Sequence, residues 1–379
     1  MSEPSLASIR TWLAAPMDQD VSEAIERLRR APDVQQIAVM PDVHLAADVC
    51  IGVVVATSRL IYPQAVGGDI GCGMLAVGLD VDASALDNPQ VAGHVLAALG
   101  HAVPSRRRNR RAAIRLPSDL ETMELSHPSL EAVRKREAVI EFATLGSGNH
   151  FIELQSDADG QLWLMVHSGS RGVGPAIRDH HLGHAEPVGG GLRALDATSE
   201  PGTLYLHDAD WARRFADANR TAIAEEVGSV MQTVLGARLR WETVITTDHN
   251  HASLEVHAGR NLWVHRKGAM PAALAQPGVL PGSMGAASFH VEGRGHEAAL
   301  CSSAHGAGRA LSRAAARANV TERELRRQMD GVWYDYRLSD RLRDEAPAAY
   351  KDIKAVLRAQ RDLVKVTRVL RPVLNYKGV

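Results

Sequence analysis

Cysteine, aromatic residues and long apolar runs are all scarce in this chain of 379 residues. Its three cysteines (Cys50, Cys72 and Cys301) are an odd, widely spaced set, which argues against a disulfide framework and favours a reducing compartment. Aromatic residues make up only 4% of the chain, so stacking on bases should not dominate binding. No run approaches the ~18 apolar residues of a membrane span, and residues 1–4 (MSEP) do not begin a signal peptide. We therefore expect a cytoplasmic protein without a membrane partner.

Net charge is also nearly absent, at −1, so the chain as a whole has no electrostatic attraction to nucleic acid. Any polyanion must therefore be bound by a local basic patch. The densest basic run is either a solvated charged face or a surface that follows an RNA backbone. It consists of Arg106, Arg107, Arg108, Arg110, Arg111 and Arg115.

Hydrophobic content of 45% and charged content of 23% are typical of a globular protein with a substantial core. Strand-like and helix-like segments alternate without a regular repeat, which favours an α+β fold with mixed sheets flanked by helices. We expect helices over residues 20–31, 130–142, 208–236, 307–317, 321–329 and 346–370. We expect strands over residues 36–40, 51–57, 74–79, 244–246, 261–264 and 286–291, and a mobile surface loop over residues 183–202.

Asp69 and Cys72 lie three residues apart in the glycine-rich segment 67–73 (GGDIGCG). A turn of this kind can direct both side chains at one point, and a thiolate with a carboxylate and imidazoles suits zinc, manganese or iron. A buried structural cysteine in a glycine turn explains the segment equally well. We interpret Cys50 and Cys301 as core residues or as neighbours of the ligands.

Histidines occur at the ends of several expected strands. His150 follows a glycine-serine stretch whose backbone N–H groups could hold an anion, and His167 follows the apolar strand 162–166. We expect only one of the neighbouring histidines His249 and His251 to join the same metal. Each of these segments could instead be a purely structural turn.

Two further groups are weaker candidates. Residues 265–268 (HRKG) could clamp a phosphate, or could be a solvated pair of charges. We interpret His180, His181 and His184 as surface residues.

Residues 281–285 (PGSMG) and 305–309 (HGAGR) form two small-residue turns. The first has backbone donors suited to a base edge or a sugar. In the second, His305 precedes an expected helix start, where N–H groups and the helix dipole favour phosphate. A neutral imidazole nitrogen can attack an activated phosphorus, and Arg309 can offset the developing charge.

Together these motifs resemble the RtcB family of tRNA-splicing ligases, which join RNA ends using GTP and manganese. The resemblance covers most of the chain, from residues 40–44 (MPDVH) to residues 376–378 (YKG), with the motifs in the family's order. It implies a single RtcB-like domain over residues 1–379 with a central metal and nucleotide cleft. Donor chemistry alone would also allow zinc, so the two manganese ions are an implication of the resemblance.

The resemblance also assigns roles. Asp69, Cys72 and His150 would hold one manganese ion, and Cys72 would bridge to a second ion held by His167 and His249. His305 would be the nucleophile that becomes linked to GMP. Asp42 and His44 would lie near the site, and Arg171 and Arg309 would meet phosphates. The nucleotide contacts would come from Asn149, His150, Glu153, His249, Asn250, Pro281, Gly282, Ser283, Met284, Ser288, His305, Gly306, Ala307, Gly308, Arg309, Lys377 and, as a stacking residue, Tyr350.

The implied activity is GTP-dependent RNA ligation. A 3′-phosphate or 2′,3′-cyclic phosphate end would be joined to a 5′-hydroxyl end through a His–GMP intermediate, in tRNA splicing or RNA repair. One alternative is a metal-dependent phosphoesterase that opens cyclic phosphates without joining ends, and another is a non-catalytic RNA- or nucleotide-binding protein. His305, Lys377 and the full ligand set favour the ligase. The RNA substrate, the oligomeric state and the need for an activator protein remain open.

The chain departs from the family pattern in two segments. Residues 265–271 (HRKGAMP) replace the usual threonine-arginine ending, and residues 45–50 lack the expected glycine-rich sequence. Because the chain is also shorter than many members, we expect a divergent branch that repairs cleaved RNAs.

Overall fold

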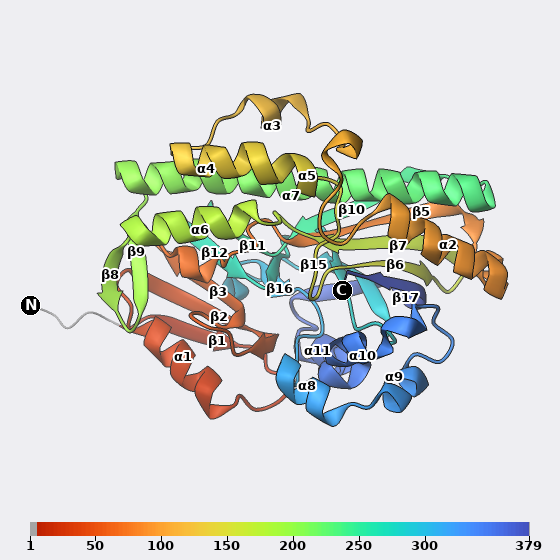
Figure 1. Cartoon of the computed structure of the whole chain (residues 1–379). Coiled ribbons are helices and arrows are strands. Elements are labelled where there is room, and N and C mark those ends of the chain that lie inside the picture. The colour runs from red at the N-terminus through yellow and green to blue at the C-terminus, as the bar shows by residue number, and fades with distance from the viewer. Residues whose placement is uncertain (1–5, 379) are drawn as a thin grey trace, which may run out of the picture.

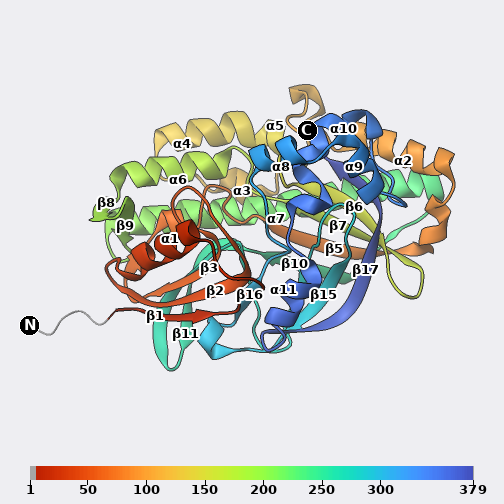
Figure 2. The same cartoon turned by 90° about the horizontal axis from the view of Figure 1, so that it is seen from below.

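The computed structural model describes residues 6–378, and the expectation about residues 1–4 therefore lies outside the described part. The α+β class is confirmed, since helices flank two large sheets (Figures 1 and 2). That residues 1–379 form one domain stays a prediction. Within residues 6–378, no helix has both the length and the apolar character needed to cross a bilayer.

The first large sheet has five strands, and only its β1–β2 pair is parallel. Its order is β1 (Ser8–Thr11), β2 (Val34–His44), β3 (Ile51–Thr57), β12 (Arg260–Lys267) and β11 (Asn250–His257). Helix α1 (Gln19–Arg29) packs on it with Val21, Ala24, Ile25 and Leu28, the apolar stripe expected from the helical period.

The second large sheet has seven strands and is wholly antiparallel. Its order is β10 (Leu239–Asp248), β5 (Gly73–Asp82), β7 (Gln161–Ser168), β6 (Phe151–Ser156), β17 (Val364–Lys377), β15 (Ser288–Gly293) and β14 (Pro277–Leu280). Helices α2 (Pro89–Ala102) and α7 (Glu200–Leu235) share a core with one face of this sheet. The two large sheets meet where β10 passes into β11 through the single residue His249.

Two small sheets and short helices complete the described chain. The sheets are β13 (Ala269–Pro271) with β16 (Ser302–Ala304), and β4 (Leu60–Ile61) with β9 (Leu192–Asp196) and β8 (Glu186–Gly189). The remaining α-helices are α3 (Ser118–Thr122), α4 (Pro128–Val133), α5 (Val139–Glu141), α6 (Val173–His184), α8 (Arg313–Asn319), α9 (Glu322–Gln328), α10 (Ser339–Leu342) and α11 (Ile353–Ala359).

Three of the predicted elements are wrong. The helix expected over 346–370 is only α11 followed by the long strand β17, because Val364, Val366 and Val369 lie in the part of β17 that pairs with β15. The helix expected from 307 begins at Arg313, after Ser312 accepts a hydrogen bond from the Ala315 N–H. The loop expected over 183–202 is a β8–β9 hairpin flanked by the end of α6 and the start of α7.

Candidate metal and nucleotide site

The junction between the two large sheets holds the glycine-rich turn 67–73 in place. The backbone N–H of His249 donates to Cys72 O at 2.8 Å, and that of Gly71 donates to Asn250 O at the same distance. A Cβ at Gly73 would lie 2.2 Å from Thr247 O, so only glycine allows the two strands to approach so closely. As a result, Cys72 and His249 lie beside one another.

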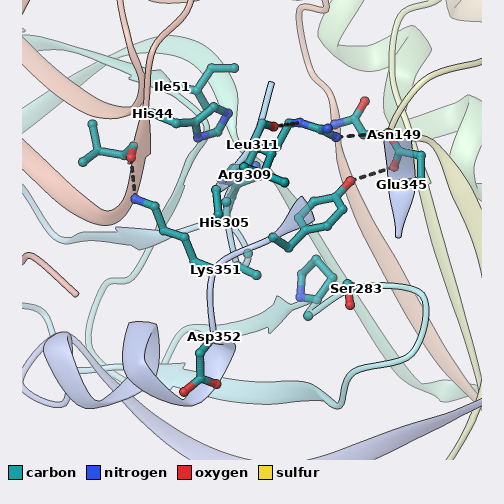
Figure 3. Close-up of a pocket in the computed structure, with 18 of the residues that line it drawn as sticks. His44, Ile51, Asn149, Ser283, His305, Arg309, Leu311, Glu345, Lys351 and Asp352 are labelled. Atoms are coloured by element: carbon teal, nitrogen blue, oxygen red, sulfur yellow. Dashed lines mark hydrogen bonds and ion pairs between the residues drawn. The ribbon is translucent and has the colours of Figure 1, made fainter. Parts of the chain in front are cut away.

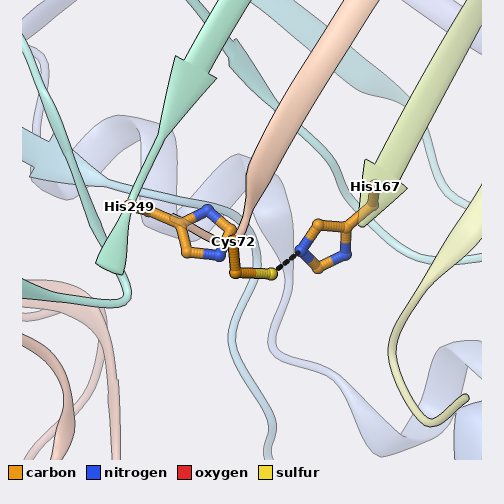
Figure 4. Close-up of side chains that lie close together, drawn as sticks. All are labelled: Cys72, His167 and His249. Atoms are coloured by element: carbon orange, nitrogen blue, oxygen red, sulfur yellow. Dashed lines mark hydrogen bonds between the residues drawn. The ribbon is translucent and has the colours of Figure 1, made fainter. Parts of the chain in front are cut away.

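Two groups of candidate metal ligands share Cys72. One is Asp69, Cys72 and His150, the other is Cys72, His167 and His249, and in each group the ligand atoms lie within 4.8 Å of one another. Cys72 Sγ lies 3.2 Å from His167 Nε2 and 3.4 Å from His150 Nε2. Figure 4 shows Cys72 between His167 and His249. The structure thus brings together the five residues that the resemblance assigned to two metals.

The electrostatics of this cluster fit a divalent cation. Burial, reinforced by Asp69, raises the pKa of the Cys72 thiol well above its usual value, so a thiolate here needs a positive neighbour. Burial lowers the pKa values of His167 and His249, which keeps both imidazoles neutral with a free lone pair. Burial opposes ionisation of Asp69, but His150 outweighs it and brings the pKa of Asp69 to about 2. Thiol, imidazole and carboxylate are donors that manganese, iron or zinc accept.

Groups behind the ligands orient them. His167 Nδ1 lies 3.0 Å from Asn149 O, which directs Nε2 toward Cys72. From α7, the buried guanidinium of Arg220 donates to Gly71 O at 2.7 Å and to Ser168 O at 3.1 Å. Arg220 therefore joins the turn that carries Cys72 to the strand that carries His167. Arg220 was not among the predicted site residues, although its spacing of four residues from Ala216 and from Ala224 places it on the buried face of α7.

His251 lies outside both groups. Its Nδ1 is 3.2 Å from Asp248 Oδ1, and its Nε2 is 3.2 Å from Arg266 Nη1. Only His249 of this pair joins the cluster. Residues two apart in a regular strand share a face, so the two side chains part because His249 lies between β10 and β11, where the strand is interrupted.

A cavity of about 930 Å³ lies beside the cluster, a size within the ~300–1,000 Å³ range of small-molecule pockets. Figure 3 shows several of its lining side chains. Of the residues expected to contact a nucleotide, those that line it are Asn149, Glu153, Pro281, Gly282, Ser283, Met284, Ser288, His305, Gly306, Ala307, Gly308, Arg309, Tyr350 and Lys377. His150, His249 and Asn250 do not line it, and the Asn250 side chain instead bonds Asp69 O and Gly268 N.

His305 lies between the metal-ligand cluster and the cavity. Its ring centroid is 4.6 Å from that of His249, and its Nδ1 is 2.7 Å from Oδ2 of the fully buried Asp42. The following turn is not helical, so a helix dipole does not act there as expected. Gly308 has φ +70°, and a Cβ on it would lie 2.3 Å from Asp42 O. Because Asp42 holds Nδ1 of His305 in a hydrogen bond, Nε2 is the free nitrogen of the ring.

Glu345 is a central residue of the cavity that sequence analysis missed. Its side chain is 3% exposed and forms ion pairs with Lys377, Arg309 and Arg313. Tyr350 Oη donates to Glu345 Oε2 at 2.6 Å, and the Arg309 guanidinium lies 5.3 Å from the Tyr350 ring centroid. One carboxylate thus gathers three cations at the cavity wall. Glu345 is a single acid from a segment with no motif of its own, so the sequence alone has no signal for it.

We expect Glu345→Ala to destabilise the protein by about 3 kcal/mol, because it leaves the buried Lys377 ammonium without its carboxylate. The measurement is the urea unfolding midpoint of the full chain. Asp340→Ala is the control, since Asp340 is exposed and its pair with Arg343 should contribute less than about 1 kcal/mol. Equal losses in the two variants would contradict a buried charge cluster at Glu345.

Glu153 lines the cavity, and its buried carboxyl group has a raised pKa. Its carboxylate oxygens accept hydrogen bonds from Gln155 Nε2 and Asn375 Nδ2, both at 2.6 Å, and it is 2% exposed. Burial raises its pKa to about 8, against the opposing effects of these partners and of Lys377. The carboxyl is therefore mainly protonated at neutral pH and can face an anionic ligand without repulsion.

The structure corrects two weaker interpretations and places a third residue outside the cavity lining. Arg266 is neither a phosphate clamp nor a solvated charge, because it is buried and paired with Glu255. His181 is not a surface residue, since it is 3% exposed and its Nε2 lies 2.7 Å from Asp208 Oδ2. Arg171 does not line the cavity and instead bonds Thr144 Oγ1 and nearby backbone carbonyls.

The run of arginines divides into two kinds. Arg107, Arg108 and Arg115 form ion pairs with glutamates, and Arg108 is nearly buried against Glu226. Within residues 6–378, the other three form no ion pair; they are Arg106, Arg110 and Arg111.

Fold and site together define an α+β protein in which a cavity of nucleotide size adjoins a buried Cys/His/Asp centre. Comparison with known proteins identifies the group: residues 24–378 match the family described as tRNA-splicing ligase RtcB. The chain belongs to the RtcB family. It is 35% identical to RNA-splicing ligase RtcB of Escherichia coli K12, over 98% of both chains. It is 30% identical to RNA-splicing ligase RtcB of Mycobacterium tuberculosis H37Rv over 89% of this chain and 96% of that one, and 28% identical to tRNA-splicing ligase RtcB of Methanococcus maripaludis over 94% and 90%.

Proposed function

We propose that this protein is a GTP-dependent RNA ligase that joins 3′-phosphate or 2′,3′-cyclic phosphate ends to 5′-hydroxyl ends. The single observation that carries the proposal is the placement of His305. Its ring lies between the cavity and the metal-ligand cluster formed by the two groups that share Cys72. The RNA-ligase names of the relatives support the same reaction class.

His305 is the proposed nucleophile. Since Asp42 accepts a hydrogen bond from Nδ1–H, the Nε2 lone pair is free to attack the α-phosphorus of GTP. An Nε2–P bond forms, the bond between the α-phosphorus and its bridging oxygen breaks, and pyrophosphate leaves. The buried Asp42 carboxylate stabilises the positive charge that the ring acquires. Lys377 and Arg309, which line the cavity, offset negative charge on the phosphates.

We propose that Asp69, Cys72 and His150 hold one manganese ion and that Cys72, His167 and His249 hold the other. When bound, two such ions neutralise developing charge on the attacking and leaving oxygens of a phosphoryl displacement. The protein's own contribution is to keep the imidazoles neutral and oriented.

The remaining steps activate the RNA 3′-phosphate with GMP and then join it to the 5′-hydroxyl end. A 2′,3′-cyclic phosphate end is first opened by water, which breaks the P–O2′ bond and leaves a 3′-phosphate. An oxygen of the 3′-phosphate then attacks the phosphorus of the His–GMP, so that the N–P bond breaks and His305 is restored. A 5′-hydroxyl then attacks the activated 3′-phosphate, a phosphodiester forms and GMP leaves. The altered 265–271 segment favours repair of cleaved RNAs over tRNA splicing. We propose that the protein acts in the cytoplasm.

The proposal is tested with α-labelled GTP and manganese, followed by denaturation of the protein. We expect wild type to retain acid-labile, base-stable label, as a phosphoramidate does, and His305→Ala to retain none. A mixture of 3′-phosphate and 5′-hydroxyl RNAs should then give a joined product. Label that persists in His305→Ala would remove this nucleophile, and opening of cyclic phosphates without joining would show a phosphoesterase instead.

A further inference from the structure

A third candidate metal group lies at the far end of the β11 strand, away from the two groups that share Cys72. It consists of His257 at the end of β11, Glu297 in the 3-10 helix η5 (Glu297–Ala299), and Cys301 just before β16. Their ligand atoms all lie within 4.8 Å of one another. We propose that these three residues form a zinc site, which is separate from the proposed ligase centre.

Two distances in this group, which end on different oxygens of Glu297, are close to those between neighbouring ligands of a tetrahedral ion. His257 Nδ1 lies 3.2 Å from Glu297 Oε2, and Cys301 Sγ lies 3.7 Å from Glu297 Oε1. Zinc bonds of ~2.0–2.3 Å at tetrahedral angles place neighbouring ligand atoms ~3.3–3.7 Å apart. Because the Glu297 side chain is 64% exposed, it can turn so that one of its oxygens reaches an ion held by His257 and Cys301.

The neighbours of His257 prepare it as a ligand. Its Nε2 lies 3.0 Å from Glu255 Oε2, and Glu255 is held in turn by both terminal nitrogens of the buried Arg266. A histidine that donates one ring N–H to a fixed carboxylate presents the lone pair of its other nitrogen, as metal-bound histidines usually do. Here that nitrogen is Nδ1, which faces Glu297.

The charges of the group also balance. Glu255 and Arg266 neutralise each other as a pair. The remaining ligands are one carboxylate, one thiolate and one neutral imidazole, with a total charge of −2 that a divalent cation compensates. Nitrogen, sulfur and oxygen donors together favour zinc over the harder magnesium or calcium.

Cys301 and Leu300 both have left-handed backbones, with φ of +45° and +53°. Such a backbone is unfavourable for residues with a side chain, and at this bend it carries Cys301 into reach of Glu297. Cys301 is partly exposed, whereas Cys50 and Cys72 are buried. It precedes His305 by four residues, with β16 between them. Zinc would therefore fasten the segment that leads to His305 onto the end of β11.

The test uses the full-length protein, stripped of metal by a chelator and titrated with zinc. We expect wild type to bind one more zinc per chain than Cys301→Ser, and Glu297→Gln to bind that zinc at least tenfold more weakly. Cys50→Ser is the matched control, since Cys50 lies in neither ligand group, and it should bind as wild type does.

A second readout follows this site alone. Alkylation of Cys301 by iodoacetamide, measured on its own peptide by mass spectrometry, should slow at least tenfold when zinc is added. Glu297→Gln, a surface change that leaves the fold intact, should remove that protection at low zinc concentrations. Equal zinc stoichiometry in wild type and Cys301→Ser, or an alkylation rate that zinc does not change, would overturn the proposal.

Discussion

Asp42→Asn should slow the transfer of GMP to His305 by about 10³–10⁴-fold while the protein stays folded. Asp42 Oδ2 lies 2.7 Å from His305 Nδ1 and 3.2 Å from the His305 backbone N. An amide has nearly the same shape, so packing around the fully buried side chain is kept. It carries no charge, however, and it can hold the ring in the tautomer whose Nε2 is protonated and cannot attack.

The measurement is the single-turnover rate at which protein acquires label from α-labelled GTP. Asp208→Asn is the matched control, because Asp208 is also fully buried and lies 2.7 Å from a histidine, His181, outside the cavity. This control should label at the wild-type rate. If Asp42→Asn also labelled at that rate, Asp42 would not be the residue that sets the tautomer of His305.

Cys72→Ser should weaken metal binding at both proposed positions by at least about 100-fold. Residues that only orient metal ligands contribute ~10–100-fold to affinity, and Cys72 is itself the ligand that the two groups share. A serine hydroxyl is far harder to deprotonate than a thiol, and it does not provide the same donor. His167→Ala removes a ligand from one group only and should leave one bound ion per chain.

Bound manganese is counted by elemental analysis after equilibrium dialysis. Cys50→Ser serves as the control, since Cys50 is a buried cysteine that belongs to neither group. It should bind as many ions as wild type. Two ions per chain in Cys72→Ser would show that the two groups do not depend on a shared thiolate.

Local patterns predicted much of the fold. The apolar stripe of α1, the β-branched run of β3 and the long helix α7 each follow from periods that need no partner elsewhere in the chain. The segment 346–370 is an example for which local patterns predict the wrong secondary structure. Its composition suits a helix, yet β17 pairs with β15 and β6, whose hydrogen bonds come from residues far away in sequence.

The same division holds for the site. Asp69 with Cys72, and His305 with its small-residue turn, are recognisable because donors and glycines are adjacent in sequence. The roles of Glu345, Arg220 and Asp42 depend on contacts with residues far away in sequence. No spacing rule connects such residues, because the separation along the chain says nothing about the separation in space.

By itself, then, the sequence determined the donor types of the proposed manganese site: one thiol, one carboxylate and several imidazoles, most of them close to glycines in sequence. Only the tertiary structure decided how they combine. The passage of β10 into β11 at His249 brings Cys72 into both ligand groups, and Glu345 gathers three cations at the cavity wall. The physical reason is that donor type is a property of each residue, whereas ligand geometry and charge pairing arise from strand pairing and burial between distant segments.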